Sequence, residues 1–108
     1  MTVNELSKKY GYSAASLPAP EKEIVGGYVG DLLSWVMGRA TENCAWITIM
    51  TNINIAAVGA LADVGVIIIA EGATPDEAVI QTAKDKGVNI LLTNKTAYET
   101  AVEISSDI

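Results

Sequence analysis

The chain has 108 residues, enough for one domain with a substantial core and too few for two. Seven Lys and Arg residues stand against thirteen Asp and Glu, and this net charge of −6, without a basic stripe, argues against nucleic-acid binding. His is absent and the single Cys44 has no partner for a disulfide or a zinc site, so we expect neither a metal nor a cofactor.

Nothing in the sequence indicates a membrane segment or a signal peptide. The mostly apolar stretch 55–70 is interrupted by Asp63 and is shorter than the ~20 residues that a spanning helix needs. At the amino terminus, Glu5 is followed by Lys8 and Lys9, without an apolar core of the signal-peptide type. We therefore expect a soluble, cytoplasmic domain.

The first elements are predicted from their end signals. Thr2 and Glu5 have the spacing of a capping box, in which each side chain satisfies a backbone donor of the first helical turn. This pair predicts a helix over Val3–Tyr10 that ends at Gly11. Two Pro then predict a loop over residues 17–21.

The middle of the chain is predicted to alternate strands and helices. Residues 24–31 mix strand formers with three Gly, which indicates a weak strand, and Asp31 is placed to cap a helix over residues 32–38. Residues 45–50 are a convincing strand, and Thr51-Asn52 follow as a turn and helix cap. The next helix, 53–62, is apolar nearly all round, so we expect it to be covered on more than one side.

A small unit is then repeated after 22 residues. Each copy reads as a helix end, a Gly suited to the left-handed conformation, a β-branched strand, a loop, and a Thr-x-x-Glu capping box that starts another helix. The matching positions are Asp63, Gly65, Val66, Ile68, Thr74, Glu77 and Ala78 in the first copy, and Asp85, Gly87, Val88, Ile90, Thr96, Glu99 and Thr100 in the second.

The repeat predicts strands at 66–70 and 89–92 and helices at 75–86 and 97–105, with Pro75 at the first helical position. Successive strand-then-helix units imply an α/β domain with a largely parallel sheet.

The order of these pieces resembles the DRTGG domain, a module of HPr kinase/phosphorylase-like proteins, some phosphotransacetylases and some CBS-domain pyrophosphatases. The residues that carry the resemblance are the Gly26-Gly27-Tyr28-Val29-Gly30-Asp31 segment, the Thr-Asn turn, the Ala-rich helix, the Gly-Val-Ile-Ile-Ile strand, the Thr-Pro-Asp-Glu helix start, the Gly-Val-Asn-Ile-Leu strand and the Thr-Asn-Lys-Thr-Ala-Tyr-Glu helix start. It covers almost the whole chain and is closest to stand-alone, single-domain members.

The chain departs from the family at both signature points. Met50-Thr51-Asn52 stand where Gly-Asp-Arg would follow a strand, and Ala70-Glu71-Gly72 stand where Thr-Gly-Gly would follow. No role of the family's Asp and Arg is therefore carried over. The resemblance implies a single three-layer α/β/α domain, similar to the amino-terminal domains of HPr kinase and the murein ligases, with a non-catalytic regulatory role and a tendency to form homodimers.

In an open parallel sheet, ligands usually bind beyond the carboxyl ends of the strands. Three predicted loops lie there, and their candidate ligand-binding residues are Thr51, Asn52, Glu71, Gly72, Thr93, Asn94 and Lys95. A modest pocket for a nucleotide or small acid is one interpretation, although the carboxylate of Glu71 would repel an anion unless Lys95 neutralised it. The alternative is that Thr51, Asn52, Thr74 and Thr96 only cap helices and Asn94 only turns the chain.

Two apolar clusters are candidate dimer contacts. Trp35 and Met37 lie on a helix too short to bury both, and the small Ala56, Gly59 and Ala60 would let another helix approach closely. The alternative is that both helices pack only within their own domain.

Three functions remain open from the sequence. The first is a homodimeric, non-enzymatic regulatory module with a small-molecule or protein-docking site at the strand ends. The second is a small transferase or hydrolase that acts on a phosphorylated or acyl substrate through Lys95 and Glu71. The third is a scaffold whose only activity is self-association.

Overall fold

A computed structural model describes residues 1–108, in which five strands form one sheet in the order β1-β5-β4-β3-β2. β2, β3, β4 and β5 are mutually parallel, and β1 at one edge is antiparallel to β5. The strands are β1 Ser13–Ser16, β2 Gly27–Val29, β3 Ala45–Thr48, β4 Val66–Ile69 and β5 Ile90–Leu92. The predicted parallel sheet is confirmed, since β4 and β5 pair with Ile67 opposite Ile90 and Ile69 opposite Leu92.

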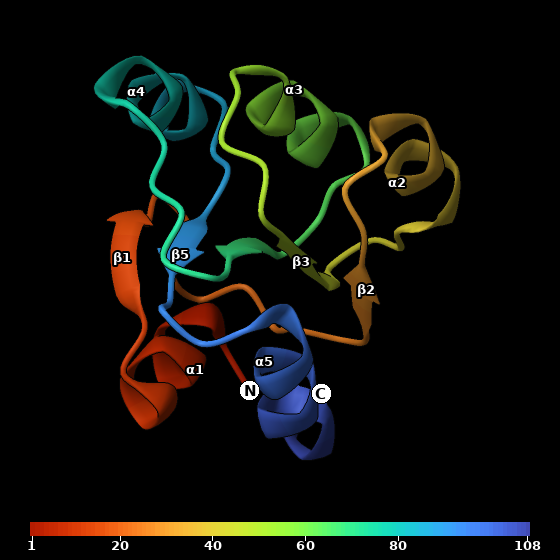
Figure 1. The fold of residues 1–108 in the computed structure, drawn as a ribbon, viewed down its shortest axis with the longest axis vertical. Helices are drawn as coiled ribbons and strands as arrows, with labels where there is room; N and C mark the ends of the chain where they lie inside the picture. The colour runs from red at the N-terminus through yellow and green to blue at the C-terminus, as the bar shows by residue number, and fades with distance from the viewer.

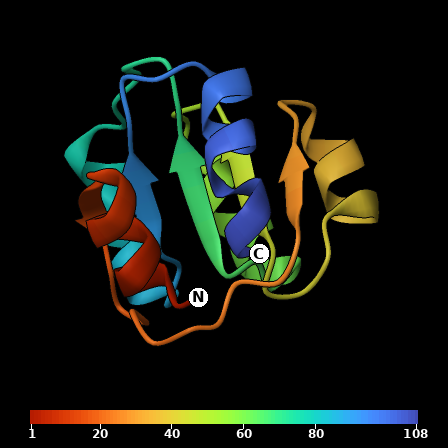
Figure 2. The same cartoon turned by 90° about the horizontal axis from the view of Figure 1, so that it is seen from below.

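Helices cover both faces of this sheet. They are α1 Val3–Tyr10, α2 Leu33–Arg39, α3 Asn54–Leu61, α4 Glu77–Asp85 and α5 Ala97–Ile104, which the 3-10 turn η1 Ser105–Asp107 follows. α2, α3 and α4 lie on one face, and α1 and α5 lie on the other (Figure 1). Figure 2 shows α1 and α5 in front of the sheet, with both chain termini on that side. The predicted three-layer α/β/α architecture is confirmed.

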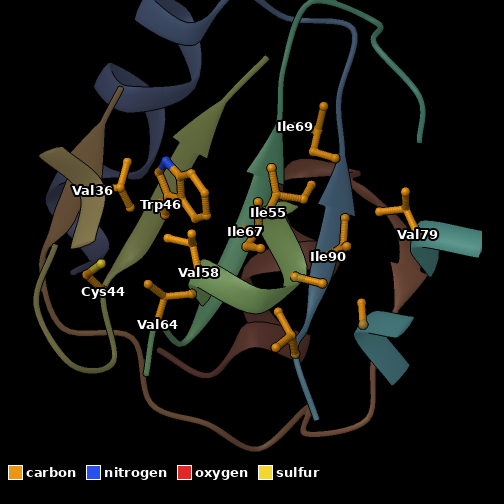
Figure 3. Packing of buried hydrophobic residues seen from close by; sticks show 13 residues of the cluster. Val36, Cys44, Trp46, Ile55, Val58, Val64, Ile67, Ile69, Val79 and Ile90 are labelled. Carbon is orange, nitrogen blue, oxygen red and sulfur yellow. The ribbon is translucent and has the colours of Figure 1, made fainter. Parts of the chain in front are cut away.

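The core has two halves because successive side chains of a strand point to opposite faces of the sheet. In β4, Ile67 and Ile69 pack toward α2, α3 and α4, whereas Val66 and Ile68 pack toward α1 and α5. Figure 3 shows the first half, in which the fully buried Trp46 lies among the aliphatic side chains of the sheet and helices. Its indole N–H donates to the carbonyl of Gly30, so the one polar atom of this large side chain is satisfied.

The two repeat copies fold less alike than their sequences suggest. Thr96 and Glu99 form the predicted capping box of α5. Thr74 does not cap α4, which begins two residues later than predicted because the side chain of Asp76 accepts from the N–H of Val79. Pro75 therefore lies in the loop and not at the first helical position.

The two glycines of the repeat also differ. Gly87 has a φ of +74°, the left-handed conformation predicted after a helix. In the first copy Asp63 takes that role, with a φ of 53°. Gly65 is needed for space instead, since a Cβ there would lie 2.4 Å from Ile24 Cδ1 and 3.0 Å from the carbonyl oxygen of Asn43.

Two further predicted helix caps, Asp31 and Thr51, are wrong. α2 begins after Leu32 without a side-chain cap, because Asp31 Oδ1 instead accepts from Thr48 Oγ1 at 2.7 Å and from the N–H of Ile49 at 3.0 Å. Asp31 thus ties the loop after β2 to the end of β3. Thr51 makes no capping bond to α3, whereas Asn52 accepts from the N–H of Asn54 at 2.9 Å.

The prediction that α3 is covered on more than one side is confirmed, since α3 lies on the sheet between α2 and α4 and contacts both helices (Figure 1). Ile55 and Val58 face the core, whereas Leu61 on the outer side is 74% exposed and Ile53, just before the helix, is 46% exposed. No helix of the structure has the length and apolar composition needed to cross a bilayer. Cys44 is buried as predicted, and this burial raises the pKa of its thiol.

Candidate functional site

A cleft of about 410 Å³ lies at the edge of the sheet where β4 and β5 end. Three segments line it, the α1–β1 turn, the β4–α4 loop and the β5–α5 loop. We call it the edge cleft, and its ten lining residues are Tyr10, Gly11, Ser13, Gly72, Ala73, Thr74, Leu92, Thr93, Asn94 and Lys95. β1 runs antiparallel to β5, so the start of β1 meets the carboxyl end of β5. This places the α1–β1 turn beside the two loops.

Backbone hydrogen bonds hold the β4–α4 loop against the β5–α5 loop. The N–H of Glu71 donates to the carbonyl of Lys95 at 2.8 Å, and the N–H of Gly72 donates to the carbonyl of Thr93 at 3.0 Å. Both Glu71 and Gly72 have a positive φ, 64° and 74°. A Cβ at position 72 would lie 3.1 Å from Asn94 Oδ1, so a glycine suits both the backbone conformation and the close approach of Asn94.

Lys95 is the only charged residue that lines the edge cleft. Its ammonium contacts both carboxylate oxygens of Glu103 at 2.7 Å, and the two side chains are 42% and 17% exposed. A second carboxylate lies one helical turn further on, where Asp107 accepts from Lys9 and from the Tyr10 hydroxyl. These two bonds lower the pKa of Asp107, the Tyr10 hydroxyl making the larger contribution. Glu103 and Asp107 in the carboxy-terminal segment therefore bind two residues that line the cleft, Lys95 and Tyr10.

Tyr12 lies directly behind these groups. It is 5% exposed, and its ring lies 5.7 Å from the Lys95 ammonium, at cation–π distance. Its hydroxyl is buried and has no hydrogen-bond partner. Burial raises the pKa of Tyr12, and the nearby carboxylate of Glu103 raises it further. A buried hydroxyl without a partner is uncommon in folded proteins, because the lost hydration is then not replaced.

The structure brings together four of the seven predicted ligand-binding residues: Gly72, Thr93, Asn94 and Lys95 line the edge cleft. The remaining three do not line it. Glu71 directs a carboxylate oxygen to the N–H of Ala97 at 3.5 Å, and Thr51 and Asn52 follow β3 at the same edge, outside the cleft. Lys95 does not neutralise Glu71, since it pairs with Glu103.

The sequence interpretation missed the third wall of the cleft. Tyr10, Gly11 and Ser13 were not candidates because Ser-Ala-Ala-Ser carries little strand signal, so β1 was not predicted. The remaining missed residues, Ala73, Thr74 and Leu92, lie within or beside loops that the sequence did select. Gly11, which ends α1 with a φ of 71°, was the available sign of a turn at this edge.

The predicted dimer contacts divide into two groups. Trp35 is 51% exposed and stacks against the Arg39 guanidinium at 3.8 Å, and Met37 and Ala60 are also exposed. Ala56 and Gly59 are buried against the chain's own sheet, and a Cβ at Gly59 would lie 2.9 Å from Ile67 Cδ1. Their small size serves the packing of α3 on β4, so they offer no surface to a second copy.

A second hollow of about 340 Å³ lies between β2 and α5 and is lined mostly by apolar residues, among them Val29, Ile47 and Ile108. It contains no charged side chain. In the whole structure, no group of three or more Cys, Asp or Glu side chains is placed to hold a metal ion.

Comparison with known proteins bears on the family and the fold. The family model described as the DRTGG domain matches residues 33–106. No curated protein sequence matches this chain. Among solved structures, the chain is similar to the CBS and DRTGG domains of the regulatory region of Clostridium perfringens pyrophosphatase, complexed with the activator diadenosine tetraphosphate.

That similarity has a TM-score of 0.77 at 16% sequence identity, and it covers 94% of this chain and 44% of the other. The chain thus spans less than half the length of that structure, and the likeness shows a shared fold. The matched residues 33–106 include the β4–α4 and β5–α5 loops of the edge cleft, whereas the α1–β1 turn precedes them.

Proposed function

This chain belongs to the DRTGG domain family, and from that premise we propose that it is a non-catalytic regulatory module that senses a small molecule in the edge cleft and acts as a homodimer. The observation that carries the proposal is the position of the cleft at the carboxyl edge of β4 and β5, where ligands of open α/β sheets bind. The side chains of Ser13, Thr74 and Asn94 line it and are exposed, so they are free to contact a ligand.

Nucleotides and small acids are the ligand classes we propose. The similar pyrophosphatase region was solved with a nucleotide activator, diadenosine tetraphosphate, which supports a nucleotide as the first class to test. The cleft volume of about 410 Å³ falls within the range of small-molecule sites.

Thermal denaturation against a panel tests ligand sensing. The panel contains nucleoside mono-, di- and triphosphates, diadenosine tetraphosphate and small carboxylic acids. A ligand at one hundred times its Kd stabilises the folded state by about 2.7 kcal/mol, which for a domain of this size raises Tm by about 10 °C or more. We expect at least one saturable rise of this kind.

Two matched Asn variants then locate the site by calorimetry. Asn94→Ala, inside the cleft, is expected to weaken binding of the active compound about tenfold, the effect of one lost hydrogen bond. Asn52→Ala, in the neighbouring turn outside the cleft, is expected to leave the affinity unchanged. A panel without any response, or equal affinities for both variants, would contradict a sensing role for this cleft.

Self-association is the second part of the proposal, and exposed apolar side chains on α2 and α3 support it. Trp35, Met37 and Leu61 are 51%, 42% and 74% exposed. Buried aromatic residues commonly anchor interfaces. We expect sedimentation to give a dimer at tens of micromolar and Trp35→Asp to give a folded monomer.

Tyr98→Asp is the matched control for Trp35→Asp. Tyr98 is an exposed aromatic residue on α5, at 78% even more exposed than Trp35, and it lies in the opposite helical layer, so this variant should remain dimeric. A monomeric wild type would remove the dimer. A wild-type dimer without any ligand response would leave a scaffold as the better function.

The transferase or hydrolase reading has no support in the geometry. Lys95 and Glu71 do not form an ion pair, because Lys95 is bound to Glu103 and Glu71 contacts the start of α5. A protein partner remains compatible with a regulatory module, as a recipient of the ligand signal.

A further inference from the structure

Behind the edge cleft, one carboxylate lies near two hydrogen-bond donors and is bonded to only one of them. The inference drawn from this arrangement rests on the proposed ligand-sensing role of the cleft. Glu103 accepts from Lys95, whose ammonium lies 5.7 Å from the Tyr12 ring. The buried Tyr12 hydroxyl makes no hydrogen bond, although Glu103 is near enough to raise the pKa of Tyr12. One acceptor thus lies near two donors, of which only one is used.

The lining of the cleft favours an anion over a cation. The chain contains thirteen Asp and Glu residues, yet none of them lines the cleft. The lining instead offers the Lys95 ammonium, its only charge, with the hydroxyl groups of Ser13, Thr74 and Thr93 and the Asn94 amide, all of which can donate hydrogen bonds. The nearest carboxylate on the adjoining loop, that of Glu71, is directed to the N–H of Ala97 and is not part of the lining.

Lys95 is suited to change partners because its side chain is 42% exposed and it both lines the cleft and reaches Glu103. If Lys95 turned to a ligand, Glu103, at 17% exposed, would lose its only bonded cation in a partly buried place. The unused Tyr12 hydroxyl is the available compensation, because a hydroxyl that donates to a carboxylate forms a charge-assisted bond.

We infer that the edge cleft takes an oxyanion, a phosphate or carboxylate group of the ligand, which binds Lys95 in place of Glu103 while Glu103 accepts a hydrogen bond from Tyr12. Because Glu103 lies on α5 and Tyr12 follows α1, the exchange connects occupancy of the cleft to the α1–α5 layer of the domain. The ligand shifts the equilibrium only by the difference in its affinity for the two arrangements.

The test uses inorganic phosphate and sodium acetate as probes, titrated at constant ionic strength with sodium chloride and followed by amide chemical shifts of residues 93–95. If phosphate binds and acetate does not, the site is specific for phosphate groups. If acetate binds as well, the site also accepts carboxylates. The absence of saturable shifts with either probe would overturn the inference.

Lys variants separate the exchange from general charge effects. Lys95→Met is expected to weaken phosphate binding by at least about tenfold. Lys9→Met removes a similar ion pair, with Asp107, and the same charge outside the cleft, so it should leave phosphate affinity unchanged. Glu103→Gln removes the competing carboxylate and is expected to tighten binding.

Tyr12→Phe gives the signature that a purely structural role would not produce. Its hydroxyl has no partner in the free protein, so removing it should leave Tm unchanged or raise it. Phosphate affinity should nevertheless fall about threefold to tenfold, and the ¹³Cζ resonance of Tyr12 in the wild type should move on phosphate addition.

The outcomes distinguish failure of this inference from failure of the proposed function. A panel compound that binds through Asn94 but is indifferent to Lys95→Met would overturn the exchange and leave ligand sensing intact. Equal phosphate affinities of wild type and Tyr12→Phe would overturn the part played by Tyr12.

Discussion

Asn89 shows how one buried polar side chain joins three distant segments. It is 1% exposed, and its amide donates to the carbonyls of Ala19 and Gly65 at 2.7 and 3.0 Å while its oxygen accepts from the N–H of Ala19 at 2.9 Å. The side chain therefore fixes the loop after β1 to the start of β4. Both N–H groups of the amide and one of the two acceptor positions of its oxygen are used.

Asn89→Asp tests this joint. The carboxylate keeps the size of the amide but faces two carbonyls with oxygen and brings a charge into the core, so we expect a loss of about 2–4 kcal/mol in the free energy of unfolding. Urea denaturation measures it. The control is Asn4→Asp, whose side chain makes no hydrogen bond and which should change stability by less than about 0.5 kcal/mol. Equal effects would contradict the role of Asn89.

At the same scale, the sequence predicted where helices end and turns occur better than it predicted which residue at each turn takes the special conformation. Asp63, Gly65 and Gly87 were all placed at a turn, but which residue takes the left-handed conformation depends on what lies opposite. Gly65 faces Ile24 and Asn43, residues far away in the chain, and local patterning does not contain that information.

At the scale of elements, the Thr-x-x-Glu motifs of the two repeat copies provide an internal comparison. Thr96 accepts from the N–H of Glu99 at 3.0 Å and caps α5, whereas Thr74 lies outside α4 and makes no capping bond. Asp76 competes for the start of α4 within the same few residues and caps it instead. Two residues able to cap a helix, Thr74 and Asp76, lie two positions apart, so the sequence alone did not determine where the helix starts.

Thr96→Ala is expected to lower the free energy of unfolding by about 1 kcal/mol, the usual contribution of a helix cap. Thr74→Ala, the same substitution at the equivalent repeat position, should change it by less than about 0.5 kcal/mol. Chemical denaturation of both variants checks this difference. A comparable loss at both positions would show that the capping roles are assigned wrongly.

The elements that the sequence predicted well are those with strong local signals. β4, with four consecutive β-branched residues buried on both faces, and α1, with its capping box and Gly11, both lie where expected. β1 was missed because Ser13–Ser16 becomes a strand only by pairing with β5. The same difference applies to the edge cleft. Its two loops after β4 and β5 were predicted from the parallel strands, whereas its wall beside β1 was not predicted.

At the scale of the whole molecule, acid should destabilise the domain through carboxylates that are ionised and bonded in the fold. Backbone N–H donors lower the pKa of Glu5 and Glu99 below the ordinary value of 4.5. A lowered folded pKa means that the stabilisation is complete above pH 4.5 and is lost as the pH falls through the folded value.

Denaturant unfolding between pH 6 and pH 3 is expected to show a decreasing free energy below about pH 4.5. Glu99→Gln preserves a capping side chain without a titrating group, so its decrease should be shallower than that of the wild type. Identical slopes for the two proteins would contradict a contribution from Glu99.

The edge position of β1 has a consequence for the order in which the molecule can be built. Ser13 lies opposite Leu92, so the first strand of this sheet in the sequence pairs with its last one. A nascent chain holds β1 without its partner until β5 has been synthesised. Closing so long a loop costs entropy, and we expect this pairing to be a late event in folding, after the parallel strands have come together.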